Sequence, residues 1–169
     1  MKKLILPGLT AVMLCMASPQ ESLNAQTPII QTKFTADPAP MVHKGTVYLY
    51  TTHDEDYAPE GMAGFRMKEW LLYTSTDMVN WTDHGTIADL YNFKWADPAV
   101  SGWGGFENGA CAPQCIERNG KFYLYCPVQG RGIGVLVADN PFGPFTDPLG
   151  KPLIGAEYDS IDPSVLIDD

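Results

Sequence analysis

The sequence predicts an all-β protein assembled from β-propeller blades. Helical periodicity is nearly absent after residue 25, where short β-rich runs are broken by Gly, Pro, Asn and Asp. Two long stretches repeat the same order of motifs, which indicates a repeat architecture. Each repeat contains four candidate strands, and four strands form one blade of a β-propeller.

The repeat emerges when the chain is shifted by 75 residues. Pro38 then aligns with Pro113, and the aromatic run 48–50 aligns with 123–125. A short turn containing Gly precedes each aromatic run, Lys44-Gly45 in the first copy and Asn119-Gly120 in the second. Turns of this kind favour β-hairpins, because Gly and Asn tolerate a positive φ.

Strands are expected at residues 41–42, 47–52, 71–75 and 86–87 of the first blade, and at 114–117, 122–127, 133–138 and 153–154 of the second. In each blade an aromatic residue in a polar turn, Trp81 or Phe145, follows the third strand and is expected to pack in the core. The first blade also carries an acidic insertion at 53–64, and long insertions in compact repeats often bind ligands.

A third blade is expected to begin at Asp162, because a shift of 50 residues places Pro113 on Pro163. Its first strand would be 164–167, and its hairpin turn would need residues beyond Asp169. We therefore expect residues 26–169 to be the N-terminal part of a longer propeller domain, with about two blades and the start of a third. A small complete β-sandwich is the alternative.

The first 25 residues have the pattern of a secretory signal peptide. Lys2 and Lys3 precede an apolar run, 4–16, that is too short to span a bilayer, and Ala25 is a small residue at the expected cleavage point. A lipoprotein signal that uses Cys15 is the alternative. We expect an exported protein, periplasmic or extracellular, which lipidation would tether to a surface.

Composition narrows the range of partners. The net charge is −9 and no Lys/Arg cluster is present, so binding to nucleic acid is not expected. No apolar run after the signal is long enough for a membrane span. The three cysteines of the mature part, Cys111, Cys115 and Cys126, lack the spacing of a zinc site. Buried free thiols are the preferred interpretation, with a disulfide between Cys115 and Cys126 as the alternative.

Two aspartates occupy the same position in successive repeats. Asp37 and Asp162 each precede a proline at the head of a first strand, and Ala112 takes that position in the second blade. First strands of propeller blades begin at one mouth of the central channel, so the two carboxylates are expected to face one funnel. Paired carboxylates are what glycoside hydrolysis requires. The simpler interpretation is that each aspartate caps a turn.

Four motifs occur in order along the chain: Ala36-Asp37-Pro38-Ala39, Gly120-Lys121-Phe122-Tyr123-Leu124-Tyr125, Asn140-Pro141-Phe142-Gly143-Pro144-Phe145 and Ser160-Ile161-Asp162-Pro163-Ser164. Together they resemble glycoside hydrolase family 43. That family consists of five-bladed β-propeller enzymes that act on xylan- and arabinan-type polysaccharides. The resemblance covers almost all of the chain after the signal.

The resemblance implies roles for both aspartates. Asp37 matches the general base, which deprotonates the water that attacks the anomeric carbon with inversion. Asp162 matches the aspartate that raises the pKa of the general acid and helps to hold the sugar. The general acid is a glutamate from a later blade, and its motif is not found in this sequence. Cys111 departs from the family pattern, since many relatives have an aromatic residue there, so the innermost sugar subsite is not carried over.

Further residues are candidates for substrate binding. The tryptophans Trp70, Trp81, Trp95 and Trp103 are candidates for stacking on sugars, and Trp95 and Trp103 are preferred because they flank an irregular segment. Asp97 and His53 are additional candidates, although a turn residue and a solvated loop histidine are the simpler interpretations. The carboxylates of residues 54–56 are the candidate ligands for a divalent cation, but we expect no metal site and no cofactor.

The resemblance to family 43, together with the paired aspartates, implies an inverting glycosidase, a β-xylosidase or α-L-arabinofuranosidase, whose partner is a pentose oligosaccharide or polysaccharide. The chain alone is expected to be inactive because it lacks the general acid. Two alternatives stay open: a non-catalytic carbohydrate-binding propeller, and a retaining five-bladed glycosidase that acts on fructans.

Overall fold

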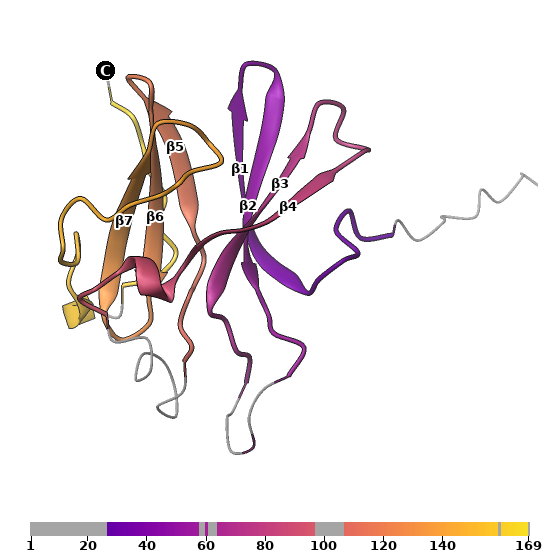
Figure 1. Cartoon of the computed structure of the whole chain (residues 1–169). Coiled ribbons are helices and arrows are strands. Elements are labelled where there is room, and N and C mark those ends of the chain that lie inside the picture. The colour runs from indigo at the N-terminus through magenta and orange to yellow at the C-terminus, as the bar shows by residue number, and fades with distance from the viewer. Residues whose placement is uncertain (1–26, 58–59, 61–63, 97–106, 159, 169) are drawn as a thin grey trace, which may run out of the picture.

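The computed structural model describes residues 27–57, 60, 64–96, 107–158 and 160–168, and within them the protein forms two antiparallel sheets (Figure 1). The first sheet has the order β1-β2-β3-β4, and the second has the order β5-β6-β7. The strands are β1 (Thr35–His43), β2 (Thr46–His53), β3 (Glu69–Ser75), β4 (Thr82–Asp89), β5 (Gln114–Arg118), β6 (Lys121–Val128) and β7 (Gly132–Ala138). Short 3-10 helices lie at Leu90–Asn92 and Ala156–Tyr158. No helix in the described ranges has the length and apolar character needed to cross a membrane.

The two predicted hairpin turns are confirmed. Lys44 and Gly45 join β1 to β2 with φ values of 49° and 78°, and Asn119 and Gly120 join β5 to β6 with 54° and 76°. Positive φ at both central residues matches the right-handed twist of the flanking strands. The turns therefore fix the register of both aromatic strands.

The second and third strands of each blade match their predicted positions closely, whereas three other expectations need correction. Strand β1 begins at Thr35, before the Asp-Pro step, so Asp37 lies inside the strand. In the second sheet the predicted fourth strand is reduced to a single bridge between Ile133 and Ile154. Residues 164–167 form no strand, because they pair with no other segment among the described residues and a strand requires ladder hydrogen bonds.

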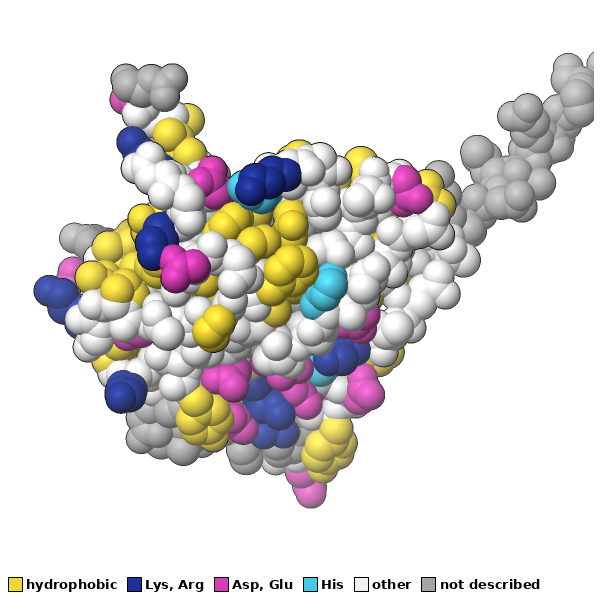
Figure 2. Space-filling view, turned by 45° about the horizontal axis from the view of Figure 1, so that its top comes forward, with side chains coloured by type: hydrophobic (Ala, Val, Ile, Leu, Met, Phe, Trp, Pro, Cys, Tyr) yellow, Lys and Arg dark blue, Asp and Glu magenta, His cyan; other side chains and the backbone are white. Residues whose placement is uncertain are grey.

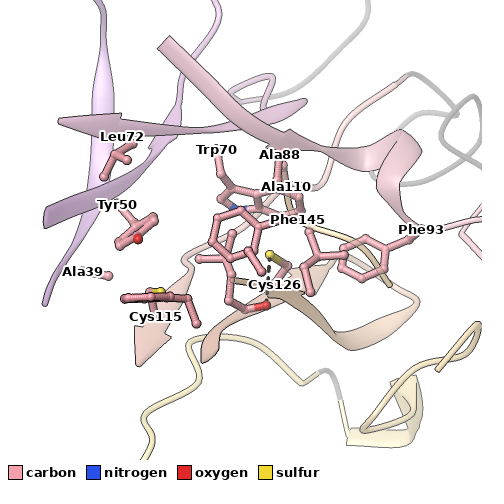
Figure 3. Packing of buried hydrophobic residues seen from close by; sticks show 14 of the residues in the cluster. Ala39, Tyr50, Trp70, Leu72, Ala88, Phe93, Ala110, Cys115, Cys126 and Phe145 are labelled. Atoms are coloured by element: carbon pink, nitrogen blue, oxygen red, sulfur yellow. Dashed lines mark hydrogen bonds between the residues drawn. The ribbon is translucent and has the colours of Figure 1, made fainter. Parts of the chain in front are cut away.

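The main hydrophobic core lies between the two sheets, whose first strands β1 and β5 are in contact (Figures 1 and 3). From β2 the core takes Tyr50, while β6 supplies Leu124, and both are fully buried. Figure 3 shows side chains from both sheets meeting there, among them Ala39, Tyr50, Trp70, Leu72, Ala88, Cys115, Cys126 and Phe145. Phe145 is in this core as predicted, whereas Trp81 packs against a smaller cluster on the other face of the first sheet.

Hydrogen bonds also tie the first sheet to segments around the second. The buried hydroxyl of Tyr50 donates to the carbonyl of Pro141 at 2.8 Å, and the indole of Trp70 donates to the carbonyl of Cys111 at 2.8 Å. Trp70 is fully buried, so the idea that it stacks on sugar is wrong. Its size and its single N–H donor instead suit a core position that needs one polar contact.

Charged side chains of both signs are interspersed on the molecular face shown in Figure 2, where hydrophobic side chains form a central patch. Lys and Arg side chains lie among acidic ones on this face and form no separate basic cluster there.

Candidate active site

Asp37 lies on a β-bulge in β1. Ala36 pairs with Thr52 and Ala39 with Tyr50, so Asp37 and Pro38 together oppose one residue of β2. Asp37 has a φ of 52°, in the left-handed region that non-glycine residues seldom occupy. A bulge bends its strand and redirects a side chain, and such strained backbone is often found at functional sites. The carboxylate of Asp37 is thereby exposed at the end of the sheet.

Thr52 orients the Asp37 carboxylate. Its hydroxyl donates to Oδ2 of Asp37 over 3.2 Å, and its side chain is fully buried in the core face of β2. A hydrogen bond from a neutral donor to a carboxylate is stronger than a bond between two neutral groups. One carboxylate oxygen of Asp37 is therefore held by a side chain of β2.

Asp162 shares the positive φ of Asp37. Its φ is also 52°, it also precedes a proline, and its side chain is also exposed. The shared conformation supports the structural equivalence that the sequence repeat predicted. Within the described part of the chain, no hydrogen bond or ion pair joins Asp37 to Asp162.

Asp54 lies close enough to Asp37 for the two charges to interact. Burial raises the pKa of Asp54 above its ordinary value, the negative charge of Asp37 raises it further, and His53 opposes the change. In the sequence Asp54 begins an acidic run, 54–56, and was predicted only as a candidate cation ligand. The alternation of β2 was the signal that could have located it, because Asp54 is two residues after Thr52.

His53 is not a solvated loop histidine, so that interpretation was wrong. Its Nδ1 lies 2.7 Å from a carboxylate oxygen of Glu69 and 3.8 Å from one of Glu55. The other oxygen of Glu69 accepts a hydrogen bond of 2.7 Å from Thr86. Strand pairing between β2 and β3 brings His53 beside Glu69, and the His53 side chain is only 13% exposed.

The donor atoms of His53, Glu55 and Glu69 lie within 4.8 Å of one another, as metal ligands would. However, the ammonium groups of Lys68 and Lys33 lie 3.1 Å from Glu55 and 3.8 Å from Glu69. They supply the positive charge that a cation would otherwise provide. We therefore interpret the cluster as an ion-pair network at the end of the first sheet.

Trp95 connects the two sheets. Its indole donates to a carboxylate oxygen of Asp147 at 3.0 Å, and its ring lies 5.0 Å from that of Phe93. It is half-buried, and its predicted contact with sugar stays a prediction. The other two predicted substrate contacts, Asp97 and Trp103, lie outside the described residues.

Cys115 and Cys126 are buried free thiols in this structure, as the preferred interpretation of the sequence predicted. Cys115 pairs with Leu124 across the ladder, so it is not the cross-strand partner of Cys126. Burial raises the pKa of the Cys115 thiol to about 12 and that of Cys126 well above its ordinary value. Such thiols are unreactive, and they act as small core residues.

Comparison with known proteins identifies the family. The family model described as "Glycosyl hydrolases family 43" matches residues 25–169. The chain belongs to this family. It is 34% identical over 161 residues to an arabinoxylan arabinofuranohydrolase of Bacillus subtilis (strain 168), covering 87% of this chain and 31% of that protein. It is 35% identical to a xylosidase/arabinosidase of Bacteroides ovatus, covering 80% of this chain and 40% of that protein.

Solved structures of family 43 agree with the fold. A beta-xylosidase/alpha-arabinofuranosidase from a compost microbial metagenome, in complex with xylotriose, matches with a TM-score of 0.67 and 33% identity, over 85% of this chain and 42% of that one. A family 43 enzyme from Xanthomonas citri, also complexed with xylotriose, matches with a TM-score of 0.66 and 33% identity, over 85% and 39%. These proteins are five-bladed β-propellers, so the two sheets are blades of such a propeller. The chain spans less than half the length of these relatives.

Proposed function

We propose that this chain belongs to a longer inverting glycosidase that hydrolyses pentose-containing oligosaccharides or polysaccharides, as a β-xylosidase or α-L-arabinofuranosidase. We call that longer protein the full-length parent. The observation that carries the proposal is the exposed Asp37 carboxylate, which a strained bulge and Thr52 orient within a family 43 chain. The relatives are named as an arabinoxylan arabinofuranohydrolase and a xylosidase/arabinosidase, and these activities support the substrate class.

In the proposed reaction, ionised Asp37 removes a proton from a water molecule. The oxygen of that water attacks the anomeric carbon on the face opposite the leaving group, which inverts the configuration. A general acid, which we place in a later blade, protonates the leaving oxygen as the glycosidic bond breaks. The acid and the base of such enzymes lie roughly 6.5–9.5 Å apart, which leaves room for the water.

We assign to Asp162 the role of keeping the general acid protonated. A negative charge close to a carboxylic acid raises the pKa of that acid by like-charge repulsion. The conformation that Asp162 shares with Asp37 supports its placement at the same mouth of the propeller. Trp95, Trp103, His53 and Asp97 stay as proposed sugar contacts.

No cofactor is needed for this chemistry, because carboxyl groups perform both proton transfers. We also propose that the protein is exported by the signal at residues 1–25, which lie outside the described residues. The oligosaccharide substrate is its proposed partner, and the acidic charge argues against nucleic acid.

The test is the substitution Asp37→Asn in the full-length parent, assayed with 4-nitrophenyl β-D-xylopyranoside and α-L-arabinofuranoside. We expect kcat to fall by at least about 100-fold, as for the loss of a general base. Asp139→Asn is the matched control, because Asp139 is 80% exposed and lies at the opposite end of the sheets. Proton NMR of the first-formed anomer should show inversion. Near-parental turnover of Asp37→Asn, or retention of configuration, would overturn the proposal.

A further inference from the structure

A second carboxylate lies beside Asp37 and has no part in the proposed water activation. The backbone N–H of Asp54 donates to the carbonyl of Phe34 at 3.0 Å, which continues the β1–β2 ladder one step beyond the pair Thr35 and His53. The alternation of β2 therefore extends to Asp54. Its side chain lies on the same face as Thr52, the residue that holds Asp37.

The Asp54 carboxylate is partly buried, and no hydrogen-bond donor reaches it from the described residues. The aspartates that cap turns differ in this respect. Asp77, for example, accepts bonds from the backbone of Val79 and Asn80, and Asp147 accepts from Leu149 and Gly150. A carboxylate withdrawn from water without donors is destabilising. The Asp54 carboxylate can therefore accept hydrogen bonds from a ligand that binds beside Asp37.

We propose that Asp54 is a specificity-determining residue that accepts a hydrogen bond from a ring hydroxyl of the pentose bound at Asp37. This inference rests on the function proposed above. A carboxylate is an acceptor only, and a pentose supplies several O–H donors, so the two are chemically complementary. The two aspartates have different roles in this proposal. Asp37 keeps one oxygen free to accept the proton of the water, whereas Asp54 takes no part in that proton transfer and only accepts a hydrogen bond from the sugar.

The neighbouring charges fit this role. Burial disfavours the charged form of Asp54, Asp37 on β1 repels it, and His53 on β2 favours it, so the pKa of Asp54 is raised above its ordinary value. A hydroxyl donor from the substrate would compensate for both the burial and the repulsion. Sugar binding and the charge of Asp54 are therefore coupled.

The test compares Asp54→Asn with the full-length parent, using 4-nitrophenyl pentosides and their monodeoxy analogues. We expect kcat/KM to fall about 5- to 10-fold on the complete sugar, because the amide oxygen still accepts a hydrogen bond but no longer carries a negative charge. On the analogue that lacks the contacted hydroxyl, the same substitution should cost less than about 3-fold, because the interaction is already absent. Asp56→Asn, an exposed residue two positions away, is the matched control and should behave like the parent.

An equal loss on every analogue, or no loss on the complete sugar, would overturn the role of Asp54. If Asp54→Asn does not fold, as judged by circular dichroism, Asp54→Ser is assayed in the same way. The Asp37→Asn variant is measured alongside. An inactive Asp37→Asn with an unaffected Asp54→Asn refutes this inference alone, whereas an active Asp37→Asn refutes the proposed function.

Discussion

Two adjacent threonines of β2 offer a direct test of how the first blade positions Asp37. Thr52 is fully buried and donates to the carboxylate of Asp37 over 3.2 Å. Thr51 is 2% exposed, lies on the opposite face, and its hydroxyl oxygen has no hydrogen-bond partner among the described residues. Replacing each by valine keeps the side-chain shape and removes only the hydroxyl. The two variants are therefore controls for each other.

The magnitudes follow from these contacts. Thr52→Val removes a hydrogen bond to a charged acceptor. We expect the loss of this bond to raise the activation free energy by about 1–2 kcal/mol, which corresponds to about a 5- to 30-fold lower kcat. Stability should change little, because water can reach the exposed Asp37 carboxylate and replace the lost donor. Thr51→Val removes a buried hydroxyl without a partner, so it should stabilise the protein by about 1 kcal/mol and raise Tm by about 2–4 °C.

Both variants would be made in the full-length parent and measured by calorimetry and by steady-state kinetics on the same pentoside. We expect Thr52→Val to lower kcat without raising Tm, and Thr51→Val to raise Tm without lowering kcat. A folded Thr52→Val variant with kcat within about 2-fold of the parent would show that this hydrogen bond does not orient the base. A destabilised Thr51→Val variant would show that the Thr51 hydroxyl has a partner.

Two further predictions concern the core and pH. Gly134→Ala should destabilise the protein by about 1–3 kcal/mol in urea unfolding, because a Cβ would lie 2.3 Å from the buried ring of Phe93, whereas Gly155→Ala, whose Cβ meets no atom closer than 3.6 Å, should be nearly neutral. Burial opposes the ionisation of Glu69, but hydrogen bonds that include one from His53 lower its pKa below the ordinary 4.5. The ionised Glu69 carboxylate therefore stabilises the folded protein above the unfolded pKa, and this stabilisation is lost as pH falls through the lowered folded pKa. The difference in urea midpoint between the parent and Glu69→Gln should accordingly become smaller between about pH 6 and about pH 3. A difference that grew on acidification would contradict the second prediction, and an unaffected Gly134→Ala would contradict the first.

The blades could be predicted from sequence because their signals are local. A hairpin turn such as Asn119-Gly120, followed by an aromatic run such as 123–125, sets the pairing of two neighbouring strands that are close in sequence. The same motifs occur in both blades, so each strand pair was indicated twice. Strand ends were less well predicted. The bulge at Asp37 adds a residue inside β1, and the sequence pattern alone read Asp-Pro as the start of the strand.

The site was predicted in part, for a physical reason. Asp37 and Asp162 carry a repeated Asp-Pro motif, and both have a φ of 52°. The contact between His53 and Glu69 depends on pairing across 16 residues, and no local pattern encodes it. The position of Asp54 was not predicted, because a run of acidic residues is typical of a solvated loop. In the structure Asp54 still forms a backbone hydrogen bond of the β1–β2 ladder.

The way in which the two sheets meet distinguishes a ring of blades from a closed sandwich. Tyr50 of the first sheet and Tyr125 of the second are equivalent in the repeat, but only Tyr50 lies in the core between the sheets. Leu124, the neighbour of Tyr125, is buried there instead, so Tyr125 lies on the opposite, half-buried face of its sheet. In a two-fold sandwich equivalent faces would meet, whereas here one face of a blade meets the other face of the next. Contacts of this head-to-tail kind repeat until a rotation closes them, so we expect a third blade to pack on the face that carries Tyr125.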